Sequence, residues 1–330
     1  MKALLSRTPG GPDTLTLEDI ADPNPGPNQV RVRVSAVGVN FPDLLIIQDL
    51  YQYKPPRPFS PGSELAGTVE VVGEGVAELK AGERVLVSPV RNAMAEKAIA
   101  EARNCWKIPD SMPFDQAAAL LMTYGTSQHA LKDRAHLKPG ETLLVLGAGG
   151  GVGLAAVELG KAMGARVIAA ASSDDKLALA KEHGADDVVK YPGSLDKTQA
   201  KALTDQFKAL VGQNGADVIY DSVGGDYTEA SLRAIAWEGR HLVVGFPAGI
   251  PKLPLNLPLL KSCQVVGVFW GEFTQRHPEA HRTNVKELMK LYTEGKIRPA
   301  VTERYPLAKA SEAIGRLGAR QARGKIVVTI

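Results

Sequence analysis

The stretch from Thr142 to Ala185 constrains the fold of this chain more than any other. It opens with a short apolar run at residues 143–146, which is typical of a parallel strand covered on both faces. Three glycines follow, then a helix expected over residues 154–163 and a second strand expected over residues 166–171. The order strand, turn, helix, strand predicts a βαβ unit and an α/β fold.

The glycine turn between the first strand and the helix predicts diphosphate binding. Glycines allow close approach to the backbone, and a helix N-terminus presents N–H groups without partners. The strict dinucleotide fingerprint is out of frame, because Ala148 stands where its first glycine would be. Strand, turn, helix and second strand all agree, so we expect dinucleotide binding here. The expected binding residues of the turn are Gly147, Ala148, Gly150, Gly151, Val152 and Gly153.

Composition narrows the class of protein further. A chain of 330 residues is long enough for two domains, and 44% apolar and 23% charged residues are ordinary for a globular protein. The formal net charge is only +3 and the basic residues are scattered, so we expect neither nucleic acid nor a membrane as partner. Two distant cysteines exclude a disulfide framework. Without a targeting pattern at its start, the chain is expected to be cytoplasmic.

The pattern along the chain changes near residue 114. Before it, valines alternate with polar residues at 30–35, further strands are expected at 66–72 and 84–88, and no long helical pattern occurs. Beyond it, a helical stretch at 117–131, broken near Gly125, precedes the βαβ unit. Apolar runs at 218–220 and 242–244 predict later strands of the same parallel sheet, a helix is expected at 279–293, and residues 325–330 predict a closing strand.

Several separated motifs resemble one superfamily. They are GVNFPDLLIIQDLY at 38–51, PGSELAGTVEVVGEGV at 61–76, AGERV at 81–85, MTYGTSQHAL at 122–131, GAGGGVG at 147–153 and GRHLVVGF at 239–246. In this order they resemble the medium-chain dehydrogenase/reductases, and among these the zinc-independent NADPH:quinone oxidoreductase branch.

The resemblance implies two domains. One is a Rossmann domain with a doubly wound parallel sheet, and the other is a β-rich, GroES-like catalytic domain. By this resemblance we expect residues 1–120 to begin the catalytic domain, 121–264 to form the cofactor domain, and 265–330 to return and complete the catalytic domain.

The chain departs from the zinc alcohol dehydrogenases of this superfamily at their metal ligands. Asn40 stands at their cysteine, Ser63 at their histidine and Ala118 near their third ligand. Catalytic zinc needs three protein ligands, usually nitrogen or sulfur. We therefore expect a reductase without a metal.

The cofactor expected from the resemblance is NADPH. NAD-specific relatives place an acidic residue at the end of the second strand, where this chain has Ala171, which leaves room for a 2′-phosphate. Asp174 and Asp175 would repel that phosphate if they pointed inward; alternatively, they begin the next helix and face water. The residues expected around the phosphate are Ser172, Ser173, Lys176, Tyr191 and Arg320.

The resemblance also assigns residues to the nicotinamide pocket. Asn40, Tyr51 and Thr123 are the candidate catalytic residues, and Gly245 and Phe246 are expected to hold the carboxamide of the ring. Each has a structural alternative: Asn40 could satisfy backbone groups at a strand end, Thr123 could cap a helix, and Tyr51 could be a rim residue.

Three functions remain open from the sequence. The first is an NADPH-dependent reductase of quinones or other α,β-unsaturated carbonyl compounds, in which placed hydrogen-bond donors meet the charge on the substrate oxygen. The second is an enoyl-thioester reductase, in which the tyrosine that follows the pocket asparagine assists protonation. The third, of another class, is an NADPH-binding protein with incidental activity. Residues 262–269 are expected to form an apolar strand, and the resemblance implies that this edge strand pairs with its copy in a second chain. Because such pairing would cover an exposed apolar edge, we expect a homodimer joined through the cofactor domains.

Overall fold

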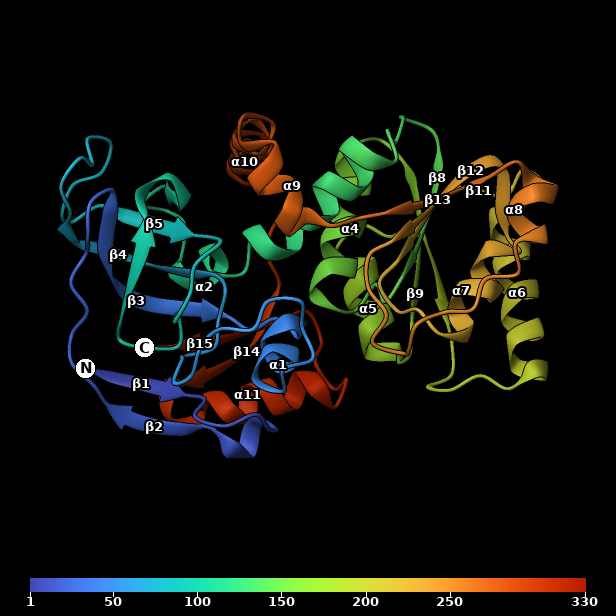
Figure 1. The fold of residues 1–330 in the computed structure, drawn as a ribbon. Helices are drawn as coiled ribbons and strands as arrows, with labels where there is room; N and C mark the ends of the chain where they lie inside the picture. The colour runs from blue at the N-terminus through green and yellow to red at the C-terminus, as the bar shows by residue number, and fades with distance from the viewer. The chain divides into compact units, whose positions relative to one another are not determined.

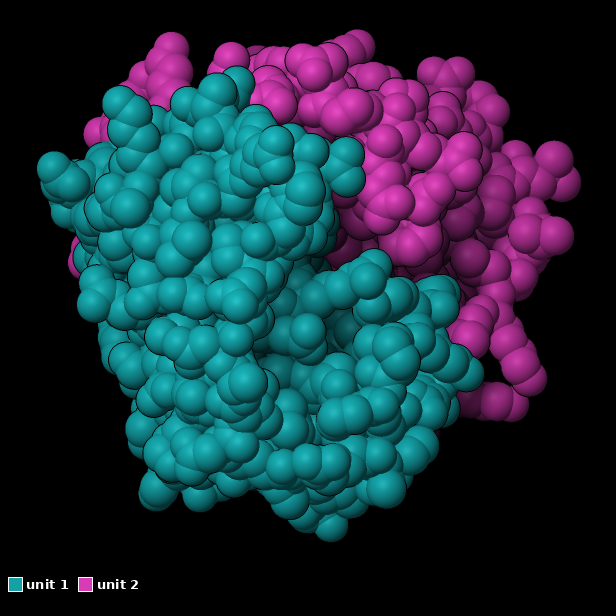
Figure 2. Space-filling view, turned by 60° about the vertical axis from the view of Figure 1, so that its left-hand side comes forward, with its two compact units in different colours: residues 1–122, 299–330 teal, residues 123–298 magenta.

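The computed structural model describes residues 1–330, and the chain forms two compact units (Figure 2). Unit 1 comprises residues 1–122 and 299–330, and unit 2 comprises residues 123–298. The chain thus returns to the first unit, but at Pro299 and not at residue 265 as expected. The intervening segment stays in unit 2 because β13 (Gln264–Gly267) pairs with β12 (Ile235–Val243).

Unit 2 has the expected α/β architecture. Its sheet has six parallel strands in the order β10-β9-β8-β11-β12-β13, with helices on both faces (Figure 1). The remaining strands are β8 (Thr142–Leu146), β9 (Arg166–Ala171), β10 (Asp187–Lys190) and β11 (Ala216–Asp221). The strand order reverses between β8 and β11, and ligands of doubly wound sheets bind at the carboxyl ends of the strands beside such a reversal.

Two helices of unit 2 were predicted with bounds, at residues 154–163 and 279–293, and both are present. α4 begins at Gly151, three residues before the expected start, because the Leu154 amide already donates to the carbonyl of the N-cap residue Gly150 (2.8 Å). The helices are α3 (Thr126–Gln128), α4 (Gly151–Ala162), α5 (Asp174–Glu182), α6 (Lys197–Val211), α7 (Asp226–Leu232), α8 (Asn256–Lys261), α9 (Trp270–Arg276) and α10 (Pro278–Thr293).

The helical stretch predicted over residues 117–131 is divided, and one division falls at Gly125, where a break was predicted. α2 (Phe114–Ala117) is followed by two π-helical segments, η3 (Leu121–Gly125) and η4 (His129–Arg134), on either side of α3. The passage from unit 1 to unit 2, between residues 122 and 123, lies inside η3.

Unit 1 is the β-rich unit. Its main sheet has the order β14-β15-β3-β4-β5-β7, with β6 added against β3, and β1 and β2 form a separate pair. The C-terminal strand β15 runs antiparallel to β3, so the returning segment completes this sheet. The strands are β1 (Lys2–Leu5), β2 (Thr16–Asp19), β3 (Gln29–Gly38), β4 (Leu65–Val72), β5 (Arg84–Val87), β6 (Lys97–Glu101), β7 (Cys105–Lys107), β14 (Val301–Pro306) and β15 (Lys325–Thr329).

Two helices of unit 1 matter for the site. α1 (Phe41–Ile47) follows β3 directly, and α11 (Ala310–Gly318) packs against it so closely that a Cβ on Gly318 would lie 2.9 Å from Leu44. The short turns η1 (Pro12–Thr14), η2 (Ala102–Asn104) and η5 (Leu307–Lys309) complete the unit.

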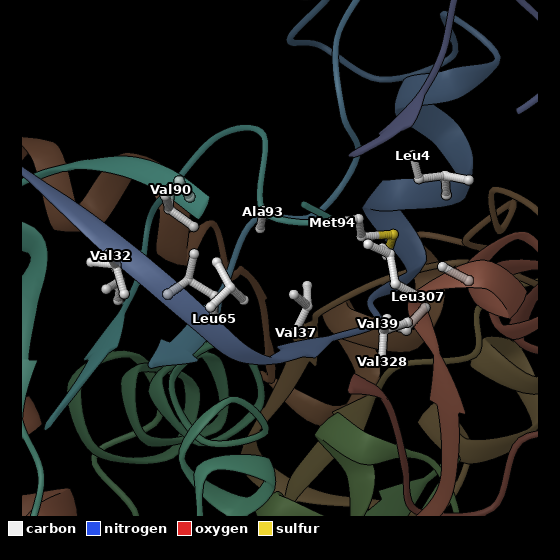
Figure 3. Packing of buried hydrophobic residues seen from close by; sticks show 14 of the residues in the cluster. Leu4, Val32, Val37, Val39, Leu65, Val90, Ala93, Met94, Leu307 and Val328 are labelled. Atoms are coloured by element: carbon white, nitrogen blue, oxygen red, sulfur yellow. The ribbon is translucent and has the colours of Figure 1, made fainter. Parts of the chain in front are cut away.

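The core of unit 1 is aliphatic. Val30, Val32 and Val34 point inward as their alternation predicted, and Figure 3 shows Val37 and Leu65 among the side chains of the same cluster. Burial of each such side chain stabilises the fold by about 1.5 to 3 kcal/mol. Polar side chains do not gain this stabilisation, so those in the interior of unit 1 need another reason to be there. None of the helices is long and apolar enough to cross a bilayer.

Candidate functional site

The glycine turn of unit 2 is built for the close approach of a ligand. Gly147 has a φ of +74°, and a Cβ there would lie 2.6 Å from Ser222 Oγ. A Cβ on Gly153 would lie 2.1 Å from the Gly147 carbonyl oxygen, so the turn needs glycine at both positions. No side chain caps the N-terminus of α4, whose first amides have no acceptor within the helix. The turn can therefore hold a diphosphate.

Lys176 lies over this turn. A Cβ on Gly149 would lie 2.4 Å from Lys176 Cβ, so the lysine stem rests on the glycine backbone. Partial burial lowers the pKa of Lys176, which is half-buried. Its cationic side chain comes from the first turn of α5, directly after β9, where the resemblance places a 2′-phosphate.

The two aspartates beside Lys176 are held in place by other groups. Asp174 pairs with Lys190 at 2.6 Å and its side chain is exposed, so it faces water as the second alternative expected. Asp175 accepts a hydrogen bond from Ser173 Oγ at the start of α5. Ser172 and Ser173 are half-buried at the end of β9.

Tyr191 lies beside the same strand end. Its amide donates to the Ala171 carbonyl (3.0 Å), and its ring lies 4.9 Å from the ring of Tyr227. The described geometry therefore brings together the glycine turn, the serines, Lys176 and Tyr191 at the carboxyl edge of one sheet.

The loops after β11 and β12 lie at the same edge. Asp221 accepts from the amides of Val223 and Gly224, each at 2.9 Å, and fixes the loop that packs on Gly147. The next loop is joined to it by the Ala248 amide, which donates to the Val223 carbonyl (2.9 Å). Gly245 begins this second loop, and the side chain of Phe246 on it is exposed.

Thr123 is buried in the π-helical segment η3. Its neighbour Tyr124 donates to Glu158 on α4 (2.5 Å), and Glu158 also accepts from the Arg298 amide (3.0 Å). Farther along, Ser127 Oγ donates to the carbonyl of Val152 in the first turn of α4 (2.8 Å). The helix that begins at the glycine turn thus fixes the segment that carries Thr123.

Asn40 belongs to a buried polar cluster in unit 1. Its Oδ1 accepts from Lys325 Nζ (2.5 Å), and its Nδ2 donates to Glu64 Oε1 (2.9 Å) and to the Gly38 carbonyl (3.2 Å). Lys325 Nζ also pairs with Glu64 Oε1 at 2.7 Å. Asn40, Glu64 and Lys325 are 7%, 1% and 4% exposed.

Asp43 lies under this cluster in the first turn of α1. Its Oδ2 accepts from the Asn40 amide (2.8 Å), whereas its Oδ1 has no hydrogen-bond partner. Burial raises the pKa of the Asp43 carboxyl to about 7, Lys325 opposes the rise and Glu64 adds to it. Tyr51, half-buried beyond the end of α1, has its pKa raised by burial and by Asp43, so its phenol stays protonated.

Arg320 belongs to unit 1 and lies just after α11, which packs on α1. Its backbone φ is +58° and its side chain is exposed. The predicted residues are therefore divided between the units: Asn40, Tyr51 and Arg320 in unit 1, and all the others in unit 2.

Sequence reasoning missed three buried charged residues: Asp43, Glu64 and Lys325. One signal was available for Lys325, because a lysine that opens an otherwise apolar closing strand is unusual in an interior. Asp43 carried another, since an acid three residues after an N-cap asparagine completes a capping box. Nothing local could show that Glu64 and Lys325 pair, because they are 261 residues apart.

The residues at and beside the positions where alcohol dehydrogenases hold their zinc do not fit a zinc ion. Asn40 and Glu64 converge there on the ammonium of Lys325, whose positive charge would repel a cation. No group of three or more His, Cys, Asp or Glu side chains could hold a metal elsewhere in the chain.

Two known domain families match the sequence. The alcohol dehydrogenase GroES-like domain matches residues 26–110, and the zinc-binding dehydrogenase domain matches residues 151–291. The quinone oxidoreductase-like protein 2 homolog of Nematostella vectensis is 40% identical over 319 residues, which cover 95% of this chain and 85% of that protein. The quinone oxidoreductase of Pseudomonas aeruginosa is 36% identical over 324 residues, which cover 97% and 96%.

Solved structures agree with these matches over the whole chain. Escherichia coli quinone oxidoreductase complexed with NADPH superimposes with a TM-score of 0.90 at 29% identity, covering 100% of both chains. A mycobacterial protein complexed with NADPH superimposes with a TM-score of 0.92 at 33% identity, again covering 100% of both chains.

Proposed function

Because the chain belongs to the quinone oxidoreductase branch of the medium-chain dehydrogenase/reductase superfamily, we propose that it transfers hydride from NADPH to quinones or other α,β-unsaturated carbonyl compounds. The family makes it an oxidoreductase. The preference for NADPH is supported by the two related structures that contain this cofactor.

One observation carries the choice of NADPH for this chain: the Lys176 stem rests on the glycine turn at Gly149. No carboxylate stands at Ala171 to receive a ribose hydroxyl, and Asp174 points to water, where it pairs with Lys190. A phosphate bound at the end of β9 would therefore lie near the ammonium of Lys176. The remaining carboxylate in the first turn of α5 is that of Asp175, which accepts a hydrogen bond from Ser173 Oγ.

When bound, NADPH supplies the hydride, and the remaining work belongs to the protein. The amides at the start of α4 would hold the diphosphate, and the loops after β11 and β12 would orient the nicotinamide. Asn40, Tyr51 and backbone N–H groups are the proposed donors to the substrate oxygen, and Thr123 is proposed to line the pocket. Because donors already in place need no reorganisation, they stabilise negative charge as it develops on that oxygen.

A screen that follows NADPH absorbance over quinones, enones and enoyl thioesters tests this proposal. Turnover of quinones or enones with NADPH, and much weaker turnover with NADH, is the expected result. Tight NADPH binding with negligible turnover across the panel would instead select a binding protein with incidental activity.

An enoyl-thioester reductase is the second candidate, and the place of Tyr51 favours it. This half-buried tyrosine lies just beyond the end of α1, whose N-cap is Asn40, so a phenol that can donate a proton follows the pocket asparagine. An enolate from a reduced thioester needs such a donor more than a quinone-derived anion does. Turnover of crotonyl thioesters clearly above that of quinones would select this function.

We also propose a homodimer joined through β13, the edge strand of the unit 2 sheet. Val265 and Phe269 on this segment are exposed, and Leu259 on the neighbouring α8 is 79% exposed. An unpaired apolar edge invites association, and pairing with a second copy would cover it. A dimer by light scattering that becomes a monomer on Val265→Asp is expected, and a wild-type monomer at micromolar concentration would contradict the proposal.

A further inference from the structure

Lys325 is a buried cation that the proposed chemistry does not use. It opens β15, its ammonium lies among groups of unit 1 that are almost fully buried, and its two hydrogen-bond partners are side chains on distant segments. Those partners are Asn40 at the start of α1 and Glu64 just before β4.

The cluster fixes the orientation of the Asn40 carboxamide. An ammonium only donates, so the side of the amide that faces Lys325 must be its oxygen. A carboxylate only accepts, so the side that faces Glu64 must be its nitrogen. A rotation of the amide by half a turn would place donor against donor and acceptor against acceptor, and would lose both charged hydrogen bonds.

Glu64 is itself fixed from two sides. Its Oε2 accepts from the Met122 amide (3.0 Å), and its Oε1 lies against Gly38, where an added Cβ would approach it to 2.4 Å. The carboxylate therefore cannot follow Asn40 if the amide moves.

The two hydrogens on Asn40 Nδ2 are not equivalent. One points to the carboxylate of Glu64 at 2.9 Å, whereas the other reaches the neutral carbonyl of Gly38 at 3.2 Å, near the long end of the normal range. A negatively charged oxygen is a much stronger acceptor than a neutral carbonyl, so it can take the second hydrogen from Gly38. Donation from Lys325 to Oδ1 polarises the amide and makes its N–H a better donor.

We propose that Lys325 and Glu64 are positioning residues that hold Asn40 with one N–H available to the substrate oxygen. This inference rests on the proposed function, in which Asn40 is a donor to that oxygen. Lys325 and Glu64 act through Asn40 and touch neither substrate nor cofactor. No proton is transferred within the cluster while the substrate oxygen becomes negative.

The test is a double-mutant cycle with Lys325→Met and Asn40→Ala. Loss of one placed hydrogen-bond donor lowers kcat about 10²–10³-fold, and we expect Asn40→Ala to lower kcat by this factor or by less. Lys325→Met should lower kcat about ten- to a hundredfold and leave the Kd for NADPH within about twofold. In the Asn40→Ala background, Lys325→Met should lower kcat by no more than about twofold. Losses that multiply would overturn the proposal.

Two further variants separate positioning from folding. Lys325→Met leaves the Glu64 carboxylate buried without its cation, which can unfold the protein, so the double variant Lys325→Met/Glu64→Gln, which leaves neither charge unpaired, serves as a second variant. It should also lower kcat and leave NADPH binding unchanged. Val328→Ala, on the same strand and in the apolar core, lowers stability without touching Asn40 and should keep kcat. A loss of kcat in Val328→Ala equal to that in Lys325→Met would make the role merely structural.

A measurement without substrate distinguishes this inference from the proposed function. In protein labelled with ¹⁵N-asparagine, the two Asn40 side-chain N–H signals should lie away from those of solvent-exposed asparagines in the wild type and should move toward them in Lys325→Met. If the signals move in this way but no quinone or enone is reduced, the proposed function fails and the positioning stands. If wild type and variant give identical signals, the positioning fails whatever the enzyme reduces.

Discussion

The buried carboxyl of Asp43 predicts a specific dependence of stability on pH. Its pKa in the folded protein is about 7, whereas an ordinary aspartate has a pKa of 3.8. The folded protein therefore holds this proton more tightly than the unfolded chain does. The resulting stabilisation is fully present below pH 3.8 and is lost as the pH rises through about 7.

The size of the effect follows from the difference of about three pKa units, which corresponds to about 4 kcal/mol in the free energy of unfolding. Between about pH 5 and about pH 8, the share that is lost is about 2.5 kcal/mol. Asp43→Asn keeps an acceptor for the Asn40 amide but cannot ionise. Relative to this variant, the wild type should therefore lose about 2.5 kcal/mol over this range.

The difference between the two proteins is the quantity to measure, because other groups titrate in the same range. Burial lowers the pKa of both His241 and His281, and that of His281 falls to about 4. Because the folded protein binds these protons less tightly than the unfolded chain does, both histidines stabilise the fold increasingly as the pH rises. Their contribution is common to both proteins and cancels in the difference. Lys325, Glu64 and Tyr51 are the charged or titratable groups that act on Asp43 or respond to it, and they too are present in both.

The assay is urea unfolding followed by fluorescence and circular dichroism at several pH values. Asp110→Asn is the matched control in the same unit, because the Asp110 side chain is fully exposed and its removal should leave the pH dependence as in the wild type. Parallel stability curves for wild type and Asp43→Asn from about pH 5 to about pH 8 would refute the assignment of a neutral, buried Asp43.

Three further predictions concern activity. Lys176→Ala should raise the KM for NADPH about ten- to a hundredfold and barely change that for NADH, because a charge-assisted phosphate contact is lost. Lys201→Ala, at an exposed lysine on α6, is the control, and equal losses for both coenzymes would assign Lys176 another role. Tyr51→Phe should change quinone turnover little, whereas a loss of about a hundredfold or more confined to enoyl thioesters would make the residue a proton donor and favour the second function. EDTA or phenanthroline should leave activity unchanged, and one zinc per chain by elemental analysis would contradict the repulsion expected from Lys325.

Much of the fold of unit 2 was determined by the sequence alone. The strand at Arg166–Ala171 has the bounds predicted for it, and the glycine turn opens a helix as expected. The signals are local, because apolar runs and required glycines act on residues a few positions apart. The resemblance, whose motifs are spread along the chain, predicted the GroES-like domain and the family, and the comparisons confirmed both.

The site residues of unit 2 were accessible for the same reason. Lys176 follows β9 so closely in the sequence that the position of the glycine turn nearly determines the position of this lysine. Their roles toward NADPH remain predictions, as do the compartment and the dimer.

Only the tertiary structure decided what surrounds Asn40. Its partner Lys325 is 285 residues away, and no local pattern shows which of many lysines is buried. The burial of Asp43 and the return of the chain at Pro299 also depend on which segments pack together. Sequence periodicity reports which face of an element is apolar, whereas the pairing of buried charges is decided by contacts between elements, which the completed sheet of unit 1 brings together.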